Sequence, residues 1–341
     1  MKQTEFKEKE KKVEALIDQI LKILLEKPEK KVRLVGHRFP DDDVWLCFWM
    51  AKKFIPEAKE AEICFVNAGQ ALPGSEGDPH ILHFDTGGGE YDQHGKGFKK
   101  TSSATILAER LDLLKDPGIK PLLEMVTAVD NIRLLPPTSI HYAIEGYPRD
   151  PKFKNQDGII DWQMVQERVF ELFDIVYNQE TRRVQSRENL KKYAEWTTLP
   201  NGLKIASILW HPELREAAFE AGAAVLVWTQ SRGPGRFYTG IQRSREYEPL
   251  RLDNIAATLR FAEAQVRGIN VQGKNLLYIG REGPITSWYL HDSLGLILNG
   301  SRSWKPTEDE YTKLQPRQIV GLIHKALSAI PSEVVSRWNS K

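Results

Sequence analysis

The stretch Val35-Gly36-His37-Arg38-Phe39-Pro40-Asp41-Asp42-Asp43 decides how the rest of the chain is interpreted. The apolar run from Lys31 to Val35 that leads into it is typical of a buried strand, and the run from Val44 to Phe54 that follows it has a helical pattern. The stretch is therefore predicted to include a loop at the end of a strand. That loop carries one imidazole and three carboxylates.

Three residues of this loop offer a mixed set of metal ligands. His37 supplies a nitrogen, and Asp41 and Asp43 supply hard oxygens. This set suits Mn²⁺, or Mg²⁺ with bound water, better than a closed structural zinc site, which usually uses thiolates. The alternative is a helix N-cap, a position that favours aspartate. One aspartate would suffice for a cap and three adjacent carboxylates repel each other, so we favour a metal site.

A second acidic stretch follows: Ile81-Leu82-His83-Phe84-Asp85-Thr86-Gly87-Gly88-Gly89-Glu90-Tyr91-Asp92-Gln93-His94. Its apolar start predicts a strand that ends near Asp85. The glycines then allow a sharp turn that brings Asp92 and His94 back towards that strand end. In open parallel sheets, sites lie outside the carboxyl ends of the strands. We therefore expect both acidic stretches to face one crevice.

With Val129-Asp130-Asn131, these stretches resemble the four metal motifs of the DHH phosphoesterase superfamily, which includes RecJ-type exonucleases, nanoRNases and manganese pyrophosphatases. The glycine run and Lys100-Thr101-Ser102-Ser103-Ala104 resemble more narrowly the melanocyte-proliferating-gene family of metal-dependent nucleases. The resemblance covers about residues 31 to 135. It departs at one place, because the Asp-His-His of the family is here Asp92-Gln93-His94.

The resemblance implies two ions, Mn²⁺ or Mg²⁺, bridged by one carboxylate, that of Asp85. The implied metal ligands are His37, Asp41, Asp43, Asp85 and Asp130. It also implies that His94 faces the phosphate, and we place His94 and Asp92 in the catalytic group. Gln93 stands at a ligating position but offers only a neutral amide oxygen. In a regular strand His83 would share the face of Asp85 and replace the lost imidazole; the alternative is a core histidine.

Substrate ligands are harder to identify. Ser102 and Ser103 precede a predicted helix, where they either bind an anion or only cap the helix. In the C-terminal part, His291, Asn299 and Arg302 are side chains of the kind that bind phosphate or a base, although surface residues look the same. The resemblance implies hydrolysis of a phosphoester of a nucleotide or a short oligonucleotide. The alternative, favoured by Gln93, is a catalytically decayed DHH-like protein that binds nucleotides or a protein partner.

The pattern of elements predicts an α/β fold. Strands and helices alternate up to about Pro137, which indicates a parallel sheet with helices on both faces. After about Leu203, short apolar runs separated by turns indicate antiparallel strands, with later helices. We expect an N-terminal amphipathic helix at 1–30, a DHH-like metal-binding α/β domain at 31–150, a helical connector at 151–200 and an α+β substrate-binding domain at 201–341.

Composition limits the class of protein. With 341 residues, 41% of them hydrophobic, the chain can bury a large core and form two domains. Its net charge of +2 argues against strong non-specific binding of nucleic acid. Cys47 and Cys64 show no paired pattern, which predicts free thiols. We expect no membrane segment, a cytoplasmic location, and an N-terminal helix that packs on its own chain, with a homodimer contact as the alternative.

Overall fold

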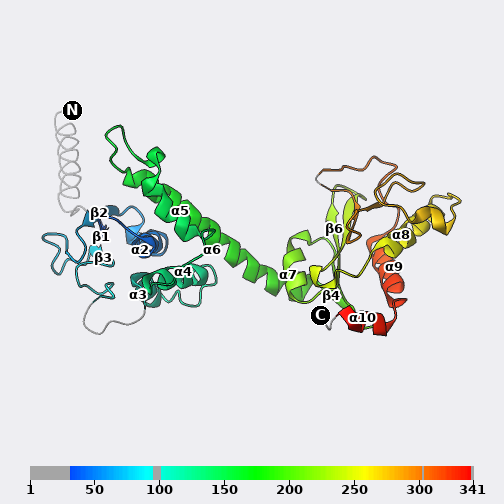
Figure 1. The fold of residues 1–341 in the computed structure, drawn as a ribbon, viewed down its shortest axis with the longest axis horizontal. Coiled ribbons are helices and arrows are strands. Elements are labelled where there is room, and N and C mark those ends of the chain that lie inside the picture. Colours follow the sequence, from blue (N-terminus) through cyan, green and yellow to red (C-terminus); the bar gives the residue numbers. More distant parts are fainter. Residues whose placement is uncertain (1–30, 95–100, 302, 339–341) are drawn as a thin grey trace, which may run out of the picture. The chain divides into compact units, whose positions relative to one another are not determined.

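The computed structural model describes residues 31–94, 101–301 and 303–338. The chain forms two compact units, and the division between Thr181 and Arg182 falls inside one long helix, α6 (Trp162–Tyr193) (Figure 1). The predicted helix at 1–30 lies outside the described residues. The predicted connector at 151–200 contains α6, while the predicted domain boundaries stay predictions.

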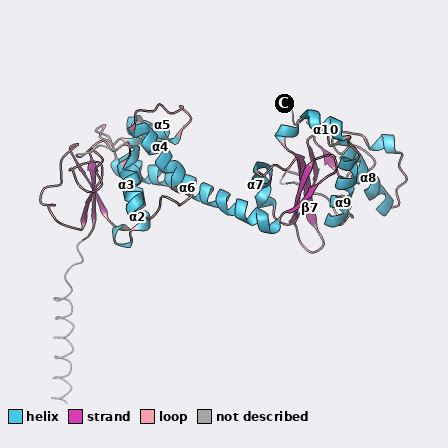
Figure 2. Cartoon of the chain, turned by 90° about the horizontal axis from the view of Figure 1, so that it is seen from below, coloured by secondary structure: helices cyan, strands magenta, loops and turns pink. Residues whose placement is uncertain are grey.

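The first unit contains a parallel sheet of three strands in the order β2-β1-β3. These strands are β1 (Arg33–His37), β2 (Glu62–Val66) and β3 (Ile81–His83). Its helices are α2 (Asp42–Phe54), α3 (Ser103–Arg110), α4 (Lys120–Asp130), α5 (Ile140–Gly146) and α6 as far as Thr181. The described helices of this unit lie on one side of the sheet (Figures 1 and 2). Within the described ranges, the prediction of helices on both faces is therefore not confirmed.

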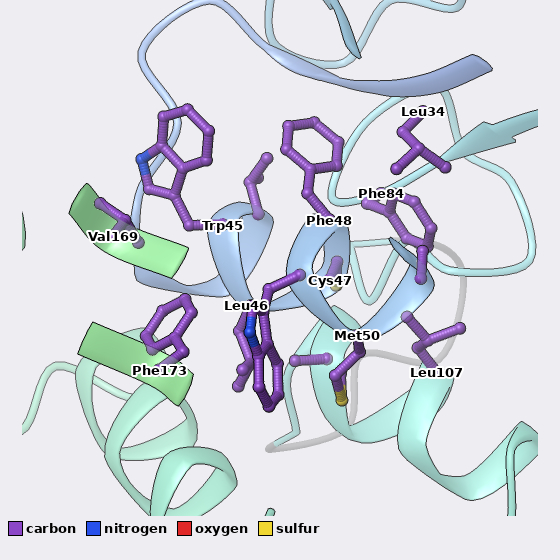
Figure 3. Close-up of a cluster of buried hydrophobic side chains, with 14 of the residues drawn as sticks. Leu34, Trp45, Leu46, Cys47, Phe48, Met50, Phe84, Leu107, Val169 and Phe173 are labelled. Atoms are coloured by element: carbon purple, nitrogen blue, oxygen red, sulfur yellow. The ribbon is translucent and has the colours of Figure 1, made fainter. Parts of the chain in front are cut away.

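Helix α2 is the centre of this unit. It is apolar on every side from Val44 to Ala51, and each of those residues is buried, as expected for a helix surrounded by other elements. Phe48 packs with Leu34 of β1 and with Phe84, which directly follows β3 (Figure 3). A Cβ at Gly36 would lie 2.5 Å from Val44 Cγ1 and 2.8 Å from Phe48 Cζ. The glycine therefore allows α2 to approach β1 closely and fixes the loop between them.

The second unit contains a mixed sheet in the order β4-β5-β6-β7-β9-β8. The strands are β4 (Glu195–Thr198), β5 (Lys204–Ile208), β6 (Val225–Ser231), β7 (Phe237–Arg243), β8 (Tyr289–Leu290) and β9 (Leu296–Asn299). The helices are α7 (Arg215–Glu220), α8 (Asp253–Val266), α9 (Pro316–Ser328) and α10 (Ser332–Trp338). The hairpin of β6 and β7 is antiparallel as predicted.

The prediction of antiparallel strands was wrong for one pair. β5 and β6 are parallel, because the chain between them crosses over through α7. Apolar side chains cover both faces of the sheet: Val225 and Val227 join one cluster, whereas Leu226 and Trp228 join another.

Two further expectations can be compared with the structure. Both cysteines are free, as predicted. No single helix among the described residues has the length and apolar character needed to cross a membrane, although α9 and α10, bent by 91° at their junction, pass that test as a pair.

Candidate metal centre

The ends of β1 and β3 position the first ligands. His37 is the last residue of β1, and Asp41 is the N-cap of α2, where Oδ1 accepts hydrogen bonds from the backbone N–H groups of Asp43 and Val44 at 3.1 Å each. The other oxygen, Oδ2, lies 3.9 Å from His37 Nε2. Asp41 can therefore cap the helix with one carboxylate oxygen and bind a metal ion with the other.

Asp85 completes a group of three. Its Oδ2 lies 3.3 Å from His37 Nε2, and ligand atoms of His37, Asp41 and Asp85 all lie within 4.8 Å of one another. One imidazole nitrogen and two carboxylate oxygens form a donor set that fits Mn²⁺. The two acidic stretches thus meet at one end of the sheet.

The backbone at Asp85 is unusual. Its φ of 53° lies in the left-handed region, which aspartate tolerates better than most residues. Its N–H lies 3.1 Å from both Ser103 Oγ and the carbonyl oxygen of Tyr91, and these contacts hold the conformation. Gly87 and Gly88, with φ of 76° and 64°, then turn the chain back towards the site.

Asp92 holds this returning loop. Its oxygens accept hydrogen bonds from the backbone N–H of Gly88 at 2.8 Å and of His94 at 2.9 Å. His94 then points Nε2 at Oδ1 of Asp85, 3.0 Å away, while 62% of its side chain is exposed. The geometry therefore places His94 where a substrate could reach it and gives Asp92 a positioning role.

Gln93 joins Asp85 to Asp130 at the end of α4. Its Nε2 lies 2.8 Å from Asp85 Oδ1 and 3.3 Å from Asp130 Oδ2. Four aspartates that the sequence places on three separate stretches therefore share one region: Asp41, Asp43, Asp85 and Asp130.

Asp43 is buried and binds a helix end. Its Oδ2 and Oδ1 accept hydrogen bonds from the backbone N–H of Ser103 and Ala104, at 2.8 Å each. The anion at the N-terminus of α3 is thus Asp43 itself. Ser102 caps the same helix through the N–H of Thr105. Both serines are fully buried: Ser102 caps the helix, and Ser103 Oγ contacts the backbone of Asp85 and Tyr91, so the geometry favours structural roles for both over substrate binding.

The carboxylates perturb one another. Burial, and next the charge of Asp130, raise the pKa of Asp43 well above its usual range. Burial and the charges of Asp41 and Asp85 raise the pKa of Asp130 to about 7. Desolvation and next the charge of Asp85 raise the pKa of Asp41.

This charge is offset only in part. Among the described residues, the basic side chains that pair with these four carboxylates are His37 and His94, and a histidine is a cation only when it is protonated. Burial lowers the pKa of His37, but the hydrogen bond to Asp85 and the charges of Asp41 and Asp85 outweigh it and raise the pKa. A cluster of this charge is a setting in which a divalent cation is stabilising.

His83 does not take part in this cluster. Its Nε2 accepts a hydrogen bond from the backbone N–H of Leu72 at 3.0 Å and lies 3.4 Å from Ser75 Oγ, so it anchors the preceding loop. Burial lowers the pKa of His83, in keeping with this acceptor role. The expectation that it shares the face of Asp85 fails because the positive φ of Asp85 breaks the strand alternation.

One pair near the site had no sequence signal. Asp42 Oδ2 lies 2.6 Å from Nδ1 of His141 on α5, and both side chains are largely buried. Burial raises the pKa of Asp42 to about 6, against the opposing effect of His141. The two residues are 99 positions apart, and no motif links them.

The second-unit candidates have local partners. His291 contacts Asp292 and Ser293 in the turn between β8 and β9 and remains 43% exposed. Asn299 is fully buried, and its Nδ2 donates to the carbonyl oxygens of Ser287 and Glu310. Its hydrogen bonds are thus used inside the protein. Arg302 lies outside the described residues.

Neither a protein-family model nor a curated protein matches the sequence. Among solved structures, the chain is similar to a DHH-domain protein described as a member of a family of ribosomal proteins, at 11% identity and a TM-score of 0.30, over 88% of this chain and 87% of that one. It is also similar to an exopolyphosphatase-related protein from Bacteroides fragilis, at 10% identity and a TM-score of 0.21, over 92% and 96%. Likenesses at these scores are too slight to assign a fold or a function.

Proposed function

We propose that this protein is a metal-dependent hydrolase that cleaves phosphoesters. One observation carries the proposal: ligand atoms of His37, Asp41 and Asp85, from two strand ends, lie within 4.8 Å of one another. Two buried carboxylates beside them, Asp43 and Asp130, have raised pKa values. Perturbed carboxylates that converge are typical of functional sites.

In this proposal the metal ligands form two groups. His37, Asp41 and Asp85 would hold one ion, while Asp43, Asp85 and Asp130 would hold a second. The oxygens of Asp43 that accept the N–H groups of α3 each keep a second lone pair. A bound pair of Mn²⁺ or Mg²⁺ ions would supply an activated water and would stabilise the charge of the phosphoryl group.

The protein side chains then have separate tasks. His94, exposed and held by Asp92, would contact the phosphate and donate a proton to it or accept one from it. Without an ion, Gln93 orients Asp85 and Asp130 through its amide; with the second ion bound, its oxygen would be a weak additional ligand. A nucleotide or a short oligonucleotide is the proposed substrate, on the resemblance of the motifs. His291, exposed in the second unit, is the remaining described candidate for a substrate contact.

The rival function is binding without hydrolysis, in a protein whose metal site has decayed. Gln93 is the feature that favours it, since an amide replaces an imidazole. The two functions differ in metal uptake. We expect the purified protein, dialysed against Mn²⁺ and then against buffer, to retain metal by elemental analysis and to hydrolyse a generic phosphodiester. A protein that retains no Mn²⁺ and hydrolyses nothing would support the rival.

A further inference from the structure

The second unit has a groove of about 610 Å³ that the metal centre does not use. It lies between the last turns of α6, helix α7 and the edge of the sheet formed by β4 and β5. Thr198 pairs with Lys204 across the two strands, and Trp196 shares their face because side chains alternate along a strand. One face of the sheet edge therefore forms one wall of the groove.

The charge of the groove is positive. Three cations and one carboxylate line it, a net charge of +2: Arg187, Lys191, Lys204 and Glu220. Glu220 accepts hydrogen bonds from Arg183 at 2.9 Å and from Arg187 at 2.8 Å. Burial opposes ionisation of Glu220, but these hydrogen bonds outweigh it and lower its pKa. The carboxylate is thus already neutralised.

The two lysines are available for a ligand. Among the described residues, no hydrogen bond or ion pair engages the amine of Lys191 or of Lys204, and both side chains are exposed. An anion that entered the groove would therefore not have to displace a carboxylate from them. Thr198 adds a hydroxyl on the same wall.

The rest of the groove is apolar and aromatic. Trp196 is 40% exposed, while Leu190 and Ala217 beside it are almost fully buried. An exposed indole over an apolar surface is suited to stacking a planar ring. The volume lies in the range of small-molecule sites.

We propose that this groove binds a nucleoside phosphate, with the base on Trp196 and the phosphate between Lys191 and Lys204. A planar ring joined to an anion matches both the aromatic part and the positively charged part of the lining. The groove belongs to the second unit and the metal centre to the first, so this binding does not depend on hydrolysis.

The test is calorimetric titration of AMP into the full chain in EDTA, so that the metal centre does not contribute. We expect AMP to bind with one site. The double variant Lys191→Glu, Lys204→Glu should weaken binding by at least about tenfold. Lys192→Glu is the matched control, because Lys192 is the next residue of α6, lies over the ring of Tyr193 and does not line the groove. It should bind as the wild type does.

Two variants of Trp196 test the aromatic part of the groove. Trp196→Leu should weaken AMP binding several-fold, whereas Trp196→Phe should retain most of it.

The lysine variants should fold as the wild type does. Because the side chains of Lys191 and Lys204 are exposed, the thermal unfolding of these variants should match that of the wild type. Absence of AMP binding, or equal binding by the double variant, would overturn the proposal. So would equal affinity for adenosine or for inorganic phosphate alone, or tighter binding of poly-glutamate.

Discussion

The side-chain amide of Gln93 donates a hydrogen bond to Asp85, with 2.8 Å between Nε2 and Oδ1, and its Oε1 contacts Oγ of Ser103. Ser103 Oγ also lies 2.6 Å from the carbonyl oxygen of Tyr91 and accepts the N–H of Asp85. A hydroxyl has a single hydrogen, which cannot serve Tyr91 and Gln93 together. The amide of Gln93 therefore has two self-consistent orientations.

These orientations differ in what faces the carboxylates. If Ser103 donates to Gln93, the Nε2 hydrogens point at Asp85 and Asp130 and partly offset their charge. If Ser103 donates to Tyr91, the rotated amide donates to Ser103 Oγ and presents its oxygen to Asp85 and Asp130. That second orientation would be unfavourable beside two anions alone. A cation between them would favour it.

The central carboxylate gives the first prediction. Asp85→Asn should reduce Mn²⁺-dependent phosphodiester hydrolysis more than about 100-fold, since loss of an outer partner of a metal ligand already costs roughly 10–100-fold. The fold should persist, because asparagine also tolerates the positive φ at this position. Steady-state rates measure the loss of hydrolysis, and thermal unfolding measures whether the fold persists. Asp157→Asn, at an exposed position of the same unit, is the control. Full activity in a folded Asp85→Asn protein would contradict the two-ion proposal.

The raised pKa values predict the pH dependence of stability without metal. The pKa of Asp130 is raised from 3.8 to about 7 on folding, so the folded state holds that proton more tightly. This contribution is present below the unfolded pKa and is lost as pH rises through the folded one. The raised pKa of His37 acts in the same direction.

We therefore expect the free energy of unfolding in EDTA, from urea titrations, to fall between about pH 5 and 7.5, where ordinary carboxylates are already ionised. Asp130→Asn should flatten this slope, and saturating Mn²⁺ should reduce it in the wild type to the part that Asp42, with its pKa raised to about 6, contributes. A wild-type slope equal to that of Asp130→Asn would mean that the pKa of Asp130 is not raised in the folded protein.

The second unit gives a prediction about fragments. The sequence suggested a domain that starts near Asn201, but β4 pairs with β5, and Leu190 belongs to the apolar cluster on that face. A fragment 182–341 should unfold cooperatively and bind AMP. A fragment 201–341 lacks β4, Trp196 and Lys191, so it should be less stable and should not bind AMP. Neither should hydrolyse phosphodiesters, since the aspartate cluster lies in the first unit. Circular dichroism and calorimetry make the comparison.

Local patterns account for what the sequence predicted well. The run from Val44 to Phe54, predicted to be helical, lies in α2 (Asp42–Phe54), and the apolar run before it leads into β1 (Arg33–His37), because apolar runs and helical periodicity are properties of neighbouring residues. The direction of β5 relative to β6 was missed for a related reason. When a strand is apolar on both faces, its residue pattern does not indicate whether the neighbouring strand is parallel or antiparallel to it.

Long-range contacts account for the rest. The pairing of Asp42 with His141 and the capping of α3 by Asp43 join segments far apart in the chain. A motif places such residues at strand and helix ends but does not say which backbone group each oxygen meets. The same holds for Asn299, whose side-chain type suggested a ligand contact and whose amide is used internally.

The last prediction concerns Gln93, the one position where the chain departs from the metal motifs that its sequence resembles. An amide oxygen is a weaker donor than an imidazole nitrogen, and presenting it requires the amide to rotate away from its hydrogen bond to Asp85. The second ion should therefore bind more weakly than the first. Gln93→His should raise the occupancy of the second site and bring activity at lower Mn²⁺ concentration.

Ser103 supports Gln93 and Asp85 without being a proposed ligand itself. In Ser103→Ala both orientations of the amide lose a hydrogen bond and the N–H of Asp85 loses one acceptor, so Mn²⁺ affinity should fall although no ligand is removed. Calorimetric titration of Mn²⁺ gives stoichiometry and affinity for each variant, with hydrolysis followed in parallel. The matched control is Ser102→Ala, because Ser102 caps the same helix but does not contact Gln93. Identical titrations for wild type and Gln93→His would place Gln93 outside the ligand set, and the amide would then serve only to hold Asp85 and Asp130 together.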